Sequence, residues 1–115
     1  MTIDEKMCII VSELVESFGT EHIVTYSEIC LLMSERYGTN PASVIPSDHC
    51  YNRVNRGITI NKPMLFEYLG NSEYRCLGEH YPYNGDVYHR SRENGYEIIV
   101  GKCINGVRDM FCDLI

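Results

Sequence analysis

Apolar residues recur every three to four positions along the first part of the chain, which is the spacing of amphipathic helices. Six apolar residues follow this spacing over residues 4–18, and Gly19 comes next as a helix terminator. The stretch TYSE at residues 25–28 is a capping box, in which a Thr hydroxyl and a Glu carboxylate satisfy free backbone donors at a helix start. The pattern therefore predicts one helix over residues 4–18 and a second from about residue 26 to Gly38.

A third helix is predicted over the segment PSDHCYNRVNRG, residues 46–57, after the turn-prone GTNP. Proline fits a first helical turn, serine and aspartate cap helices, and a glycine ends the segment. The buried stripe of this helix would be Cys50, Tyr51 and Val54. Its outward face would carry Asp48, His49, Asn52, Arg53 and Arg56.

The hydrophobic period changes to two after this segment, which indicates strands. MLFEYL and EYRCL, residues 64–69 and 73–77, flank a Gly-Asn-Ser turn and predict a hairpin. Three Asn-Gly pairs follow, and Asn-Gly is the strongest short hairpin signal. The strands expected around them are residues 86–90, 96–103 and 107–112.

Three helices followed by a hairpin resemble a winged helix-turn-helix domain, with residues 47–56 as the recognition helix and residues 64–77 as the wing. The string PSDHCYNRVNRG is also similar to segments in small bacterial proteins and in domains found with restriction-type nucleases. The predicted fold class is α+β: three N-terminal helices, then a wing hairpin and a small antiparallel sheet. A single domain over residues 1–115 would hold a helical part, about 4–57, and a β-rich part, about 64–112.

The resemblance implies that the outer face of the third helix meets DNA in the major groove. Asn pairs bidentately with adenine and Arg with guanine, so Asn52 and Arg53 are the candidates for base recognition. An ordinary solvated helix face, whose Asn and Arg side chains cap and pair locally, is the alternative. The candidates for phosphate or adjacent-groove contacts are His49, Arg56, Lys62 and, on the wing, Arg75.

The stretch EHYPYNGDVYHR, residues 79–90, combines aromatic and basic side chains. Tyr81, Tyr83, Tyr88 and Arg90 could stack on unpaired or flipped bases, or anchor a protein interface. Tyrosines that bury a ring and leave the hydroxyl wet are the simpler interpretation.

Composition restricts the number of domains and the kind of partner that the protein can have. A chain of 115 residues with 44% hydrophobic content fits one compact domain. The net charge of −6 argues against indiscriminate binding of nucleic acid. Its distribution is uneven, since residues 47–92 carry six basic against five acidic residues, and this middle contains the third predicted helix. The chain thus combines an acidic scaffold with a locally neutral to basic centre.

The absence of an export signal and of a long apolar run favours a cytoplasmic protein with no membrane contact. The six cysteines fall within apolar patterns, so we expect reduced and mostly buried thiols. No metal-binding, phosphate-loop or nucleophile motif is present. We therefore expect no catalysis, no metal and no cofactor.

Two hypotheses of different classes follow. The first is a non-catalytic winged-helix protein that binds double-stranded DNA, as a regulator or as a reader module of a nuclease or defence system. A homodimer is compatible with it, because one short helix buries little DNA surface. The second is a protein-interaction module, such as a phage-type inhibitor of CRISPR or restriction systems. Its acidic surface would dock on a nucleic-acid enzyme.

Overall fold

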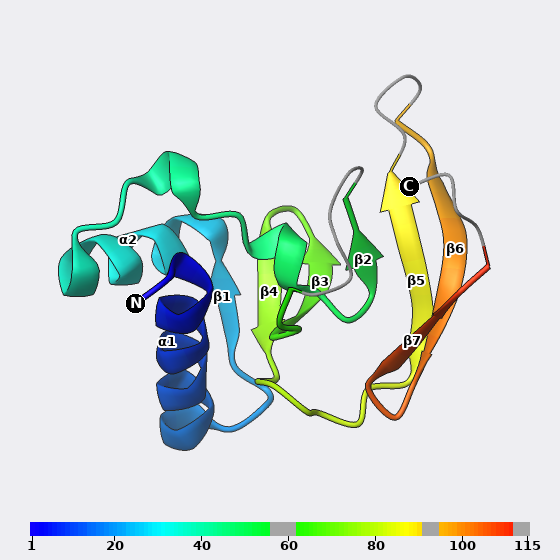
Figure 1. Cartoon of the computed structure of the whole chain (residues 1–115), viewed down its shortest axis with the longest axis horizontal. Coiled ribbons are helices and arrows are strands. Elements are labelled where there is room, and N and C mark those ends of the chain that lie inside the picture. Colours follow the sequence, from blue (N-terminus) through cyan, green and yellow to red (C-terminus); the bar gives the residue numbers. More distant parts are fainter. Residues whose placement is uncertain (56–61, 91–94, 112–115) are drawn as a thin grey trace.

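The computed structural model describes residues 1–55, 62–90 and 95–111. Figure 1 shows two helices at one end of the molecule, a first sheet in the middle and a second sheet at the other end. The helices are α1 (Ile3–Phe18) and α2 (Tyr26–Tyr37), and two short 3-10 turns follow at Pro41–Ser43 and Pro46–His49. The strands are β1 (Ile23–Thr25), β2 (Arg53–Val54), β3 (Phe66–Gly70), β4 (Glu73–Cys76), β5 (Gly85–Arg90), β6 (Glu97–Ile104) and β7 (Val107–Met110).

Both predicted N-terminal helices are confirmed, and their ends lie where the capping residues place them. Thr25 caps α2 as expected, since its hydroxyl accepts a hydrogen bond from the Glu28 N–H while the Glu28 carboxylate accepts one from the Thr25 N–H. Thr2 and Glu5 form a second capping box at the start of α1. Gly38 ends α2 with φ of 64°, a left-handed conformation that glycine adopts without strain.

The third predicted helix, residues 47–56, is wrong. Only Pro46–His49 forms a 3-10 turn, and the chain is then extended through β2. His49, Cys50 and Tyr51 are three consecutive buried residues. A surface helix buries one stripe and exposes the next position, whereas an extended chain between two layers buries both sides. Since the helix is absent, there is no helix-turn-helix, and the arrangement of three N-terminal helices followed by a wing is also wrong.

The predicted hairpin exists as β3 and β4, although it is no wing. It is part of a three-stranded antiparallel sheet in the order β1-β4-β3, so β4 has a neighbour on both sides. The later strands are confirmed to within a few residues, and Asn105-Gly106 makes the turn between β6 and β7, with both residues at positive φ. These strands form the second sheet, in the order β2-β5-β6-β7, where β2 and β5 are parallel.

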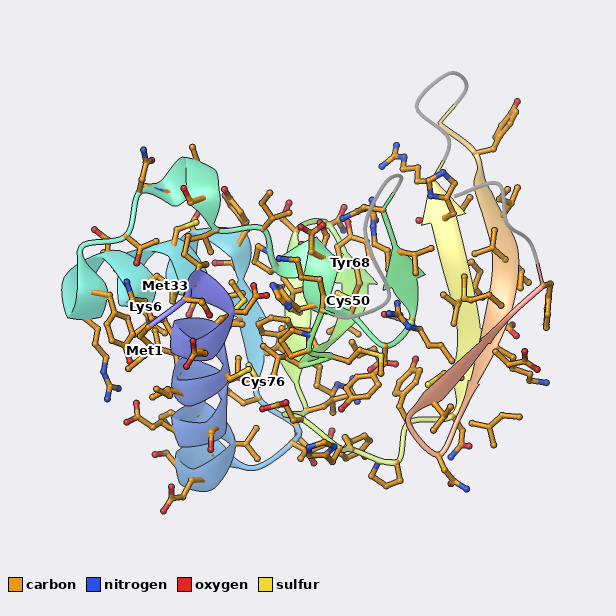
Figure 2. The ribbon with its side chains drawn as sticks, viewed as in Figure 1. Met1, Lys6, Met33, Cys50, Tyr68 and Cys76 are labelled. Carbon is orange, nitrogen blue, oxygen red and sulfur yellow. The ribbon has the colours of Figure 1, made fainter. Side chains whose placement is uncertain are left out.

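Two apolar clusters lie on either side of the extended segment. The first joins α1 and α2 to the first sheet, and Cys50 belongs to it. The second joins the second sheet to Leu77, and Tyr51 belongs to it. Figure 2 labels Cys50 between the helices and the second sheet. Neighbouring residues of one extended segment thus enter different clusters, because side chains alternate along a strand.

The cysteines are mostly buried, as expected. Cys30, Cys50, Cys76 and Cys103 are buried and Cys8 is partly exposed, and all five are free thiols. Burial raises the pKa of Cys8 to about 11 and that of Cys76 to about 12, which keeps both thiols protonated. Cys112 lies outside the described residues.

The residue that joins the two sheets is Asn52, whose side-chain amide pairs with the β3 backbone while its own carbonyl pairs with β5. Its Nδ2 donates to the Tyr68 carbonyl at 2.9 Å, and its Oδ1 accepts from the Tyr68 N–H at 2.8 Å. Its carbonyl accepts from the Tyr88 N–H at 3.0 Å. One residue therefore extends the ladders of both sheets.

We predict that Asn52→Ala lowers the free energy of unfolding by about 2–4 kcal/mol. The substitution leaves one backbone donor and one acceptor of Tyr68 unpaired, at roughly 1–3 kcal/mol each. Urea unfolding measures the change, and Asn84→Ala is the control because the Asn84 amide makes only exposed bonds. Equal losses in the two variants would show that Asn52 does not join the sheets.

Candidate functional site

The segment Ser47–Asn55 is held at several points by its own polar side chains. Asn55 closes the segment on itself, since its Nδ2 donates to the Ser47 hydroxyl and to the Asp48 carboxylate, each at 2.8 Å. At the start of the extended part, the His49 carbonyl accepts from the Leu65 N–H. These bonds fix the path of the backbone before it reaches β2.

Tyr51 anchors the segment to the chain that leads into the second sheet. Its hydroxyl donates to the Gly78 carbonyl at 2.6 Å and accepts from the Tyr81 N–H at 2.9 Å. Its ring stacks on Tyr83 with centroids 5.6 Å apart. Tyr83 in turn donates its hydroxyl to Glu67 at 2.8 Å. Burial first, and then this carboxylate, raise the pKa of Tyr83. Tyr81 and Tyr83 therefore pack around Tyr51.

His49 lies beneath the surface and is only 3% exposed. Its Nδ1 lies 2.8 Å from the Pro63 carbonyl, and its Nε2 lies 3.5 Å from the Asp4 carboxylate. Burial lowers the pKa of His49, against smaller raising effects of the Pro63 carbonyl and of Asp4. Lys62, another predicted phosphate contact, forms an ion pair with the same Asp4 at 3.2 Å.

A cleft of about 210 Å³ opens where the segment passes from the first sheet to the second. Asn52 and Arg53 of the extended segment line it. The rest of the lining comes from residues 68–70 on β3, from Tyr88 and Arg90 on β5 and from Glu97 on β6. Four residues singled out from the sequence, Asn52, Arg53, Tyr88 and Arg90, thus lie together in one concave site.

The guanidinium of Arg53 lies over the ring of Tyr68, with its Cζ 4.6 Å from the ring centroid. Such cation–π contacts contribute about 0.5–2 kcal/mol and hold the guanidinium in place. The Nε of Arg53 is buried and has no hydrogen-bond partner among the described residues. At the cleft rim, Arg90 donates from Nε to the Gly95 carbonyl at 3.3 Å. The described lining of the cleft thus includes two cations, one carboxylate and two tyrosine rings.

The other predicted site residues lie elsewhere. Arg75 lies within 3.6 Å of Glu67 and Glu21 in a separate polar hollow of about 280 Å³, which Tyr81 and Tyr83 also line. Arg56 lies outside the described residues. The sequence analysis did not select Tyr68 and Glu97. The signal that could have found Tyr68 is the alternation of side chains along FEYLG, which places Tyr68 on the same side of the strand as Phe66.

The lining of the cleft determines the chemistry it offers. None of the described lining residues is a serine, cysteine or histidine, and Glu97 is the only carboxylate in this described set. Over the described residues, no group of three or more His, Cys, Asp or Glu side chains is placed to hold a metal ion. Fixed guanidinium groups next to aromatic rings are suited to binding an anion attached to a planar ring.

Comparison with known proteins adds a family but no activity. The model of a domain of unknown function, DUF7225, matches residues 2–110. The chain belongs to the DUF7225 family. Over 88 residues it is 46% identical to "Uncharacterized protein YnaC" of Bacillus subtilis (strain 168), an alignment that covers 76% of this chain and 33% of that protein. The chain thus spans about a third of the length of this relative.

No solved structure gives a significant match to the chain. Neither match indicates a winged helix-turn-helix family, and the structure lacks the third helix, so the family resemblance drawn from the order of elements was wrong. Neither matched description mentions a nuclease. In the described parts of the chain, none of the helices has the length and apolar character needed to span a bilayer.

The environment of His49 predicts a dependence of stability on pH. Because burial holds the folded-state pKa below the ordinary value of 6.5, the unfolded state takes up the proton first as the pH falls. Stability should therefore be complete above pH 6.5 and decrease below it. Urea unfolding at pH 7.5 and 5.5 measures this, and His49→Gln should remove the difference.

A second variant separates this effect from general acid sensitivity. The Asp4 carboxylate raises the pKa of His49, so Asp4→Asn should increase the loss of stability between pH 7.5 and 5.5. An unchanged or smaller loss in Asp4→Asn, or a full loss in His49→Gln, would contradict the assignment.

Proposed function

We propose that this domain binds DNA without catalysis, as a reader module or regulator, and that the cleft between the two sheets is its binding site. The third helix that was to enter the major groove does not exist, so the proposal rests on the cleft instead. It does not extend to a nuclease or defence system, because neither matched description mentions one.

The observation that carries the proposal is the position of the Arg53 guanidinium and its lack of a described anionic partner. Its guanidinium is held over Tyr68, its buried Nε has no hydrogen-bond partner, and no ion pair to it is found among the described residues. An incoming anion would meet the rest of this guanidinium, whose charge no described carboxylate neutralises. Arginine is the side chain best suited to phosphate and to the guanine edge.

Local charge supports the same conclusion despite the net charge of −6. Among the described residues that line the cleft, two are basic, Arg53 and Arg90, and one is acidic, Glu97. Cations on the helices form ion pairs within the protein, as Arg36 on α2 does with Glu13 on α1. The acidic surface outside the cleft would repel DNA phosphates, which would disfavour nonspecific contacts and confine the DNA to the cleft. YnaC is about three times as long as the match, which is compatible with a reader module in that larger protein.

A protein-interaction module remains the second candidate because of the outer strands. Several large apolar side chains on and beside β6 and β7 are exposed. Exposed apolar groups clustered on two paired strands are typical of protein-binding surfaces. They are Tyr96, Ile98, Ile99, Ile104, Val107 and Phe111.

We predict that Arg53→Ala weakens DNA binding about tenfold or more, which corresponds to about 1.4 kcal/mol. Fluorescence anisotropy with labelled random-sequence duplex and single strands, over a salt series, measures the affinity. The wild-type affinity should fall with salt, and the variant should show a log–log slope flatter by about 0.7–0.9, the contribution of one phosphate contact.

Arg36→Ala is the matched control, since it also removes one arginine but lies on α2. It should leave the affinity within about twofold, the scatter expected when no contact is lost. Equal losses in the two variants would mean that DNA is not held in the cleft. Absence of binding to any strand at low ionic strength would remove the proposal and favour the protein-interaction module.

A further inference from the structure

The size and walls of the cleft restrict what part of a DNA strand can enter it. A volume of about 210 Å³ lies below the range of roughly 300–1,000 Å³ that is typical of pockets for drug-sized ligands. A double helix cannot enter such a space. A single base with its phosphate at the rim is the part of a nucleic acid that matches it in scale.

None of the described residues that line the cleft belongs to a helix. Asn52 and Arg53, which line the cleft, belong to an extended segment whose strand, β2, is only two residues long. Base edges inside a duplex are read by an element that projects into the major groove, whereas Arg53, Tyr88 and Arg90 line a hollow. A hollow of this kind can read a base that has left the stack.

The side chains of Arg53 and Tyr88 form one surface. These residues are direct partners in the parallel pairing of β2 and β5, so their side chains project side by side from the same face. Arg53 is backed by the ring of Tyr68. Bases stack on guanidinium planes as well as on aromatic rings in known single-strand sites.

Arg90 is placed to hold the phosphate of the same nucleotide. It follows Tyr88 by two residues on β5, so it projects from the same face, roughly 7 Å further along the strand. Its exposed position lets the guanidinium reach a strand that passes outside the cleft.

We propose that the cleft accepts one unpaired nucleotide of a DNA strand, with its base on the surface of Arg53 and Tyr88 and its phosphate at Arg90. This inference rests on the proposed DNA binding and adds the form of DNA that is recognised. Bulged, mismatched and single-stranded sites bind more tightly than perfect duplex, because their unpaired base is already out of the stack.

The test compares a perfect duplex with the same duplex carrying one bulged nucleotide. Anisotropy gives the two affinities, and 2-aminopurine at the bulge reports the environment of the unpaired base. The wild-type protein should bind the bulged duplex about 5- to 150-fold more tightly, the range that corresponds to stacking of one base. Tyr88→Ala should reduce this preference to within about twofold, because the surface on which the unpaired base stacks is lost.

Phe18→Ala is the matched control, because Phe18 is an exposed aromatic at the end of α1 and does not line the cleft. It should keep the full preference, and thermal unfolding checks that both variants are folded. Equal binding of perfect and bulged duplex would overturn this inference and leave the proposed DNA binding intact. Displacement of the bulged duplex by a free mononucleotide at the same affinity would overturn it too. Absence of binding to every strand removes both proposals.

Discussion

The fold depends on the way the Asn52 side chain replaces a missing stretch of strand. Beyond Tyr51, none of the described strands pairs with β3 on this side, and the Asn52 amide supplies a donor and an acceptor to Tyr68 in place of one. The Asn52 carbonyl meanwhile pairs with Tyr88. Buried backbone groups must find partners, so a chain that crosses between two sheets needs a residue that serves both. An amide side chain reproduces the geometry of a peptide group, which a carboxylate or hydroxyl does not.

The position of the cleft follows from this junction. Arg53 comes directly after Asn52, and its partner Tyr88 lies beside it across the β2–β5 pair. Tyr68, the residue that Asn52 binds, is also the ring over which Arg53 lies. The bonds that join the sheets therefore also place the cation, its aromatic support and the facing tyrosine. Rigid placement of this kind is what a binding site requires, because the ordering of its side chains is complete before a ligand arrives.

Local signals in the sequence were sufficient for the elements that are stabilised locally. Capping boxes, terminal glycines and period-two runs predicted α1, α2 and the strands β3 to β7, because each of these signals acts within a few residues. The short strands β1 and β2 were not predicted. The prediction for the segment around Asn52 was wrong because the conformation of this segment depends on partners far along the chain, such as Tyr68 and Gly78. Its apolar residues, Cys50, Tyr51 and Val54, fit a helical stripe equally well.

Part of the candidate site was predicted, although the recognition helix on which the prediction rested does not exist. Arg53, Tyr88 and Arg90 were selected as basic and aromatic residues, and they do meet in one cleft. His49 and Lys62 were selected on the same grounds, yet both interact with Asp4 on α1. The sequence pattern shows which residue types are present, whereas long-range strand pairing decides which of them share a surface.

The central claim is that this junction builds a binding surface for DNA. A titration of isotopically labelled protein with a short single-stranded oligonucleotide, followed by NMR, tests it most directly. The account predicts that the Arg53 Nε–H and the amides of Tyr88 and Arg90 shift together and with one affinity. Shifts confined to β6 and β7, to the helices, or absent throughout would contradict it.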